Sequence, residues 1–160
     1  MGIRMSTSEV KMKSFLNRAA KYLQTTILKA LSKLGDECVV KVRDRAETES
    51  WINQTGNLRS SIGFATYDRG KKYMMSTMST VLKGKEGSAA GKKMIDELAK
   101  EYANVYALVV IAAMEYASYV EAVESKDVLA STTTWAKGVV EGRINTAVKY
   151  AMAEINKWDL

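Results

Sequence analysis

The stretch that decides the fold class is I-G-F-A-T-Y-D-R-G-K, residues 62–71. Ile62, Phe64 and Thr66 alternate with the residues between them, which is the two-residue period of a β-strand. The last four residues have the polar and glycine content of a tight turn, so the strand should fold back on itself. Residues 73–82 are rich in Tyr, Thr and Val and predict the returning strand. The chain is therefore expected to contain a sheet and not to be a simple helix bundle.

Helices are predicted on both sides of this hairpin. Apolar residues recur at steps of three and four over residues 8–46 and again over residues 134–158, which indicates two long amphipathic helices. Shorter helical segments are expected at residues 94–102 and 115–123. The order of elements predicts an α+β domain. It has a long N-terminal helix, a small antiparallel or mixed sheet with an extended hairpin, and a C-terminal helix packed on the sheet.

Three further segments complete the predicted organisation. Residues 105–113 are continuously apolar, which predicts a central strand covered on both faces. Residues 47–61 are polar and should form a loop, and the glycines within residues 84–91 indicate a flexible stretch. No repeat or linker divides residues 1–160, so a single domain is expected.

Composition argues against an enzyme. The chain of 160 residues has no histidine and one cysteine, Cys38. Histidine-based general bases, Ser-His-Asp sites and most zinc sites are therefore excluded, and we predict no catalytic residue, cofactor or metal. Cys38 falls on the apolar stripe of the first helix and should be buried. The longest apolar run, residues 105–114, is about half the length of a membrane-spanning helix, so no membrane contact is expected.

The positive charge is concentrated in one segment. Residues 69–93 contain seven basic residues and one glutamate, a surplus equal to the net charge of +6 of the whole chain. The segment also contains methionines, which suit adaptable contact surfaces. It is either a solvated hairpin tip or a basic arm that reaches an acidic partner, protein or nucleic acid. The interface residues predicted here are Arg69, Lys71, Lys72, Met74, Met75, Met78, Lys83 and Lys85.

A phosphate-binding loop is also considered for this segment and rejected. The glycine before Gly91-Lys92 is Gly87, one residue too late for the G-x-x-x-x-G-K pattern. Lys93 then occupies the position of the Ser or Thr that would bind magnesium. We therefore expect no nucleotide site.

Two short motifs carry a family resemblance. The first is T-G-N-L-R-S-S-I at residues 55–62, and the second is Y-A-S-Y-V-E at residues 116–121. In this order, between a long N-terminal and a C-terminal helix, they resemble the tail-completion (head–tail joining) family of long-tailed bacteriophages. The chain departs from that family at residues 122–129, where members usually have an aromatic-Gly turn and a proline-containing segment.

The resemblance implies a non-catalytic structural protein of the virion. Members form a ring where the tail meets the head, so the expected location is the neck or tail end, and the host cytoplasm during assembly. The expected partners are copies of the chain itself and neighbouring connector, tail-terminator or tail-tube proteins. A small basic nucleic-acid-binding accessory protein is the alternative, with Lys71, Lys72, Lys83 and Lys85 contacting phosphates.

The motif residues supply the remaining interface predictions. Arg59 offers a forked donor to a carboxylate, and Glu121 is an available acidic partner, either within the chain or across a ring interface. Tyr116 and Tyr119 are expected to be partly buried packing residues, although tyrosine is also favoured at interfaces. Asn57 completes the set of residues predicted from the two motifs.

Overall fold

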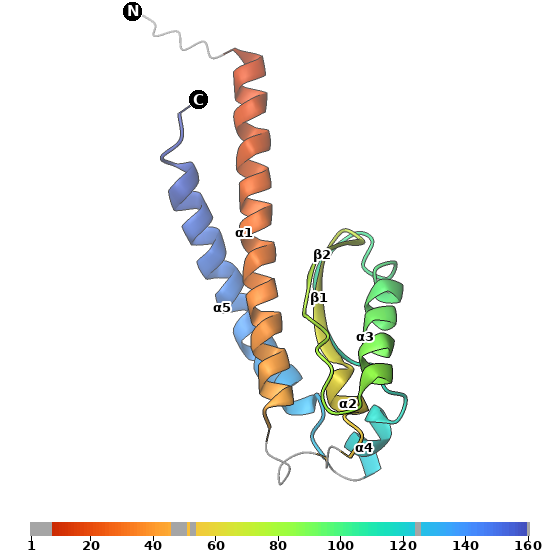
Figure 1. Cartoon of the computed structure of the whole chain (residues 1–160). Coiled ribbons are helices and arrows are strands. Elements are labelled where there is room, and N and C mark those ends of the chain that lie inside the picture. The colour runs from red at the N-terminus through yellow and green to blue at the C-terminus, as the bar shows by residue number, and fades with distance from the viewer. Residues whose placement is uncertain (1–7, 46–50, 52–53, 124–125, 160) are drawn as a thin grey trace, which may run out of the picture.

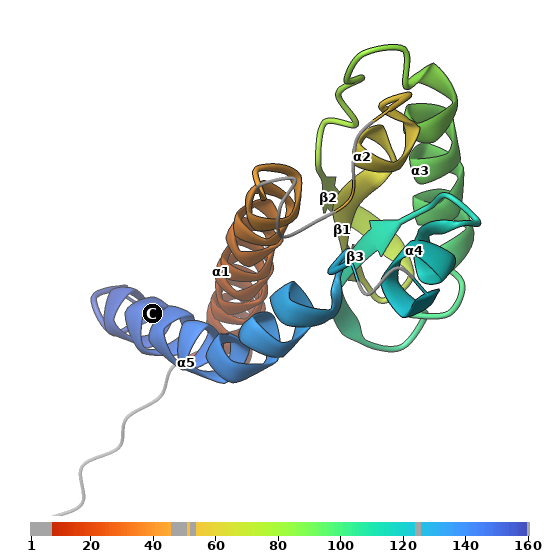
Figure 2. The ribbon, with the colours of Figure 1, turned by 90° about the horizontal axis from the view of Figure 1, so that it is seen from below.

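A computed structural model describes residues 8–45, 51, 54–123 and 126–159. The elements form three layers, with α1 and α5 on one side of a sheet and α3 on the other (Figures 1 and 2). The α+β class predicted from the sequence is confirmed. In chain order the elements are α1 (Glu9–Arg43), α2 (Asn57–Ser60), β1 (Ile62–Asp68), β2 (Lys71–Met75), α3 (Lys85–Leu98), β3 (Tyr106–Ala112), α4 (Ala117–Val123) and α5 (Ala130–Ile155).

The sheet has three strands in the order β2-β1-β3, and both pairings are antiparallel. The turn between β1 and β2 places Arg69 at φ 48° and Gly70 at φ 78°, the left-handed pair that a two-residue hairpin requires. The returning strand ends at Met75, well before the predicted limit at Leu82. Just beyond Met75 the Ser76 amide donates to the Phe64 carbonyl, whereas the Phe64 amide donates to the Ser76 hydroxyl and not to a backbone carbonyl, both at 3.0 Å.

The alternation predicted for β1 divides the core in two. Ile62 and Phe64 join a cluster that includes residues of α1, and Ala65 and Tyr67 join a cluster that includes residues of α3. All four side chains are buried because helices cover both faces of this strand. Cys38 also lies in the α1 layer and is fully buried, as predicted. Burial, followed by the charge of Glu37, raises the pKa of its thiol.

The prediction that residues 105–113 form the central strand is wrong. β1 is central, and β3 is an edge strand whose side chains are mostly only half-buried. The apolar run reflects contact with helices on both faces, because even-numbered residues face α1 and odd-numbered residues face α3. The outer edge of β3 pairs with no strand in the described part of the chain.

The glycine-rich stretch after residue 84 is helical, contrary to the prediction of a flexible segment. α3 begins at Lys85, and a Cβ atom built on Gly87 would lie only 1.9 Å from the Asn57 carbonyl oxygen. The glycine therefore serves close packing of α3 on α2. Residues 69–93 accordingly supply the hairpin turn, β2 and most of α3, and they do not project as an arm (Figure 1).

α1 is longer than the sheet and projects beyond it (Figure 1). Gln24 donates a hydrogen bond to Asp68 at the hairpin end of β1, so residues 9–23 lie beyond the sheet. There α1 packs on the end of α5, where the Trp158 ring lies 5.2 Å from that of Tyr22. α5 runs mainly along α1, and Leu129, the residue just before α5, packs against the core cluster that includes Ile62 and Phe64 of β1.

Candidate functional site

The first motif forms the short helix α2 at the end of the sheet opposite the hairpin, where a loop was predicted. Gly56 precedes α2 with φ 80°, and a Cβ atom there would lie 2.0 Å from the Val81 carbonyl oxygen. Only glycine fits this positive φ and close approach without strain. Much of the predicted loop before it, at residues 46–50 and 52–53, lies outside the described residues.

The second motif lies beside the first. The Ala113 amide, at the end of β3, donates to the Ser61 hydroxyl at 3.1 Å. Leu58 of the first motif and Ala117 of the second are buried in the same cluster as Trp51. Two segments more than fifty positions apart in the sequence are thus brought together at one end of the sheet.

A groove of about 650 Å³ opens between these segments. Its wall combines apolar side chains with two amides, a hydroxyl, a carboxylate and an amine, which is the mixture found at recognition surfaces. Asn57 is already engaged within the chain, since its Nδ2 donates to Glu86 at 3.2 Å and its Oδ1 accepts from the Gly87 amide at 3.3 Å. The groove is lined by Trp51, Gln54, Thr55, Asn57, Leu58, Glu86, Met114, Tyr116, Val120 and Lys126.

Arg59 lies behind the groove with an unusual environment. Its guanidinium stands over the Trp51 ring, 5.4 Å from the centroid. Its Nε and Nη2 atoms are buried and have no hydrogen-bond partner among the described residues. A second guanidinium is close, because Arg43 Nε donates to the Arg59 carbonyl oxygen at 3.0 Å. Burial, followed by the charge of Arg59, lowers the pKa of Arg43.

Glu121 does not pair with Arg59. Its Oε1 atom accepts hydrogen bonds from the backbone amides of Leu129 at 2.9 Å and Ala130 at 2.7 Å. The carboxylate therefore caps the start of α5, a favourable place for negative charge. The sequence analysis left two alternatives for this pair, one within the chain and one across a ring interface. Among the described residues, Arg59 makes no ion pair with Glu121 of its own chain.

The two motif tyrosines are more exposed than predicted. Tyr116 is 41% and Tyr119 is 57% exposed, and Tyr116 lines the groove. Large aromatic side chains at this exposure are typical of protein interfaces. Tyr119 lies on α4, and Tyr116 directly precedes it.

The predicted basic residues do not form one surface. Arg69, Lys71 and Lys72 lie at the hairpin end of the sheet, where Arg69 pairs with Asp68 at 3.0 Å and Lys72 pairs with Asp96 at 2.6 Å. Lys83 and Lys85 lie at the opposite end, on either side of Gly84, which packs against Gly56. The structure thus divides the positive charge and neutralises part of it.

The three predicted methionines differ in exposure. Met74 is 43% exposed on β2, Met75 is half-buried against α3, and Met78 is only 5% exposed. Met78 packs in the cluster between α3 and β1, so it presents no surface to a partner in this conformation.

Sequence reasoning missed four residues of this region: Trp51, Arg43, Glu86 and Lys126. Trp51 carried a signal, because a lone tryptophan within a polar segment is either buried or part of a binding surface. The described residues contain no group of three or more His, Cys, Asp or Glu side chains that could hold a metal ion. None of the described helices is long and apolar enough to cross a membrane.

No protein-family model, curated protein or solved structure matches this chain.

Proposed function

We propose that this chain is a non-catalytic, ring-forming tail-completion or head–tail joining subunit at the neck or tail end of a tailed bacteriophage. The observation that carries the proposal is the meeting of the two motifs that resemble this family. Leu58 and Ala117, one from each motif, pack in one cluster, and Asn57 and Tyr116 line one groove.

The environment of Arg59 supports a docking role for this end of the molecule. Two of its donors have no hydrogen-bond partner among the described residues, and a second arginine lies beside it. A buried donor without a partner is costly, so such a site is stabilised when a carboxylate arrives. A neighbouring subunit of a ring, or another neck protein, would supply that carboxylate.

The decisive experiment is electron microscopy of lysates from a phage that carries a stop codon in this gene. Filled heads lying apart from tails, or tails of unregulated length, are the expected result. Expression of the intact chain from a plasmid should restore joined particles and serves as the control. Normal infectious particles without the protein would overturn the proposal.

Arg59 provides a second, residue-level test. Complementation by Arg59→Gln should fail although the purified variant stays folded by circular dichroism, and Arg59→Lys should complement poorly because it lacks the forked geometry. Lys149→Gln, a change at an exposed position of α5, is the matched control and should complement fully. Full complementation by Arg59→Gln would remove the docking role of this arginine.

Nucleic-acid binding is the competing prediction. The basic residues lie at opposite ends of the sheet, and this separation argues against a single surface that contacts phosphates. It requires DNA binding with a steep salt dependence, carried by Lys71, Lys72, Lys83 and Lys85. Absence of binding at low salt would remove it.

A further inference from the structure

The outer edge of β3 carries backbone groups that pair with no strand among the described residues, and these groups follow a regular pattern. The Arg69 amide donates to the Val105 carbonyl at 3.0 Å, and the Ala113 amide donates to the Ser61 carbonyl at 3.4 Å. In an antiparallel ladder these bonds recur at every second residue, so the odd-numbered residues of β3 bond to β1. The even-numbered ones direct their N–H and C=O groups outward: Tyr106, Leu108, Val110 and Ala112.

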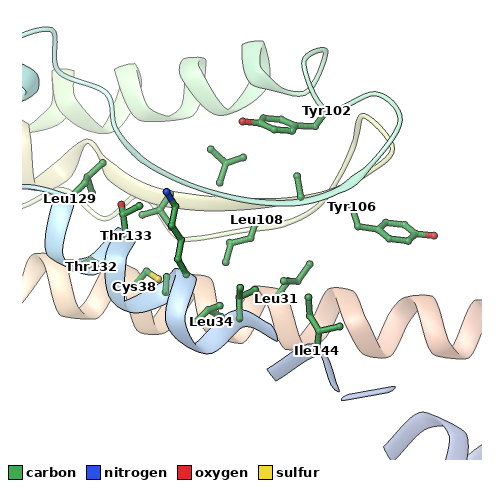
Figure 3. Close-up of a pocket in the computed structure, with 16 residues that line it drawn as sticks. Leu31, Leu34, Cys38, Tyr102, Tyr106, Leu108, Leu129, Thr132, Thr133 and Ile144 are labelled. Carbon is green, nitrogen blue, oxygen red and sulfur yellow. The ribbon is translucent and has the colours of Figure 1, made fainter. Parts of the chain in front are cut away.

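An apolar groove of about 530 Å³ runs along this same edge. Figure 3 shows side chains of α1, β3 and α5 converging on it, among them Leu31, Leu108 and Ile144. Tyr106, Leu108 and Val110 line the groove and also carry outward backbone groups. A strand added here would be held by main-chain hydrogen bonds and would place every second side chain in the groove.

The chain contains a segment with the matching pattern. Residues 1–7, which lie outside the described structure, read M-G-I-R-M-S-T, with apolar side chains at positions 1, 3 and 5. This is the two-residue period of a strand with one apolar face. We propose that residues 1–7 of a second copy add to the edge of β3 as a fourth strand and place Met1, Ile3 and Met5 in the groove.

The segment cannot do this within its own chain. Gln24 lies level with the hairpin end of the sheet, where Asp68 faces Tyr106, the first residue of β3. Helix α1 continues from there to Glu9, which at 1.5 Å per residue places Glu9 about 22 Å beyond the sheet. Seven extended residues span about 24 Å at most, which suffices only to return to the near end of β3. The strand must therefore come from another molecule.

This exchange gives each copy one donor segment and one acceptor edge on different surfaces. Such a head-to-tail contact closes into a ring when the rotation between neighbours fits. The ring closure rests on the proposed function, whereas the pairing of residues 1–7 with β3 can be measured without it.

The test uses the full chain with Ile3→Asp and Met5→Asp, which blocks donation but leaves the acceptor edge intact. A fluorescent peptide of residues 1–9 should bind this protein saturably in an anisotropy titration. The same peptide with Ile3→Asp should bind at least about tenfold more weakly, because a carboxylate is costly in an apolar groove. Absence of binding, or equal binding of both peptides, would overturn the proposal.

Main-chain pairing is tested with two N-methylated peptides, one modified at Ile3 and Met5 and the other at Gly2 and Arg4. Only one set can point its amides at β3, so one peptide should lose binding and the other should keep it. If both bind or neither binds, strand addition is refuted.

The outcomes separate the two proposals. Peptide binding together with normal particles from the stop-codon phage would keep the strand exchange and remove the neck function. Defective particles without peptide binding would keep the neck function and remove the strand exchange.

Discussion

The two edges of the sheet are built in opposite ways. β2 carries Lys71 and Lys72, and its pairing with β1 shifts register between Thr66 and Tyr67, as at a β-bulge. Lysines and bulges are the common means by which proteins prevent edge-to-edge pairing. β3 has neither, since its seven residues are uncharged and its register with β1 is regular. The difference teaches that only one edge of this sheet is protected from a further strand.

The same contrast extends to the chain around each edge. On the β2 side, residues 76–84 return along β1, and α3 packs closely on α2 through Gly87. On the β3 side, the groove that β3 forms with α1 and α5 stays open. Four comparisons of variants test whether this division into a closed and an open side is real.

The largest effect is expected at the centre of the sheet. Phe64→Ala should lower the free energy of unfolding by about 4 kcal/mol, because the side chain is only 1% exposed on β1. Val110→Ala on β3 should cost about 1 kcal/mol, because its side chain is only half-buried beside the groove. Urea unfolding of both variants measures the difference. Equal losses would mean that β3 is as enclosed as β1.

Gly87→Ala should cause the second largest loss in the free energy of unfolding. The added methyl group would meet the backbone of Asn57 at 1.9 Å, so we expect a loss of about 3 kcal/mol. Gly138→Ala on α5 is the matched control, because a Cβ atom there meets nothing within 4 Å. The control should gain about 1 kcal/mol from helix propensity alone. Thermal unfolding that moves both variants in the same direction would contradict the close packing of α3.

The stability of the protein at alkaline pH tests how tightly α3 encloses the sheet. Tyr67 is fully buried and donates to the Ile95 carbonyl at 2.5 Å. Burial, followed by the charges of Asp96 and Tyr102, raises its pKa from 10.0 to about 12. The neutral phenol is favoured in the fold, so its contribution is complete below pH 10 and is lost as the pH rises to about 12, by up to about 1.4 kcal/mol per pH unit.

Urea unfolding between pH 9 and 12 compares the chain with Tyr67→Phe. The variant should lose less stability over this range than the unmodified chain. An identical pH dependence would show that the phenol is not enclosed by α3.

The smallest effect on stability concerns the protected edge. Lys72→Val removes an ion pair whose side chains are 37% and 66% exposed, so stability should change by less than about 0.5 kcal/mol. Its main consequence should be self-association, measured by light scattering, because the edge loses a charge. Lys149→Val on α5 is the control. Unchanged scattering would show that Lys72 does not protect β2.

Sequence periodicity predicted the faces of the elements but not the edges of the sheet. The alternation of Ile62 and Phe64 predicts β1 correctly, because alternate residues of this strand enter different core clusters. The apolar run of β3 was mistaken for a central strand, since side chains report which faces are covered, whereas a free edge is a property of the backbone. Gly87 was read as flexible because close packing against α2 depends on residues distant in sequence.

The candidate site was predictable in part. The two motifs identified the segments that meet, but not their partners. Glu121 caps α5 and does not meet Arg59, a choice set by the path of the chain between α4 and α5. The division of the basic residues likewise follows from residues 76–84, which carry Lys83 to the far end of the sheet. Neither fact can be read from charge counts.

The length of α1 has a consequence for amide hydrogen exchange. Its C-terminal half is buried against the sheet through Leu28 and Val42, so those amides exchange only when the whole domain opens. Its first turns contact no sheet, and Val10 is 77% exposed, so they can fray while the domain stays intact. One continuous helix thus has two levels of protection from amide exchange, with the boundary near Gln24. Before this boundary the sheet does not protect the helix, so only an assembly partner could slow exchange there further.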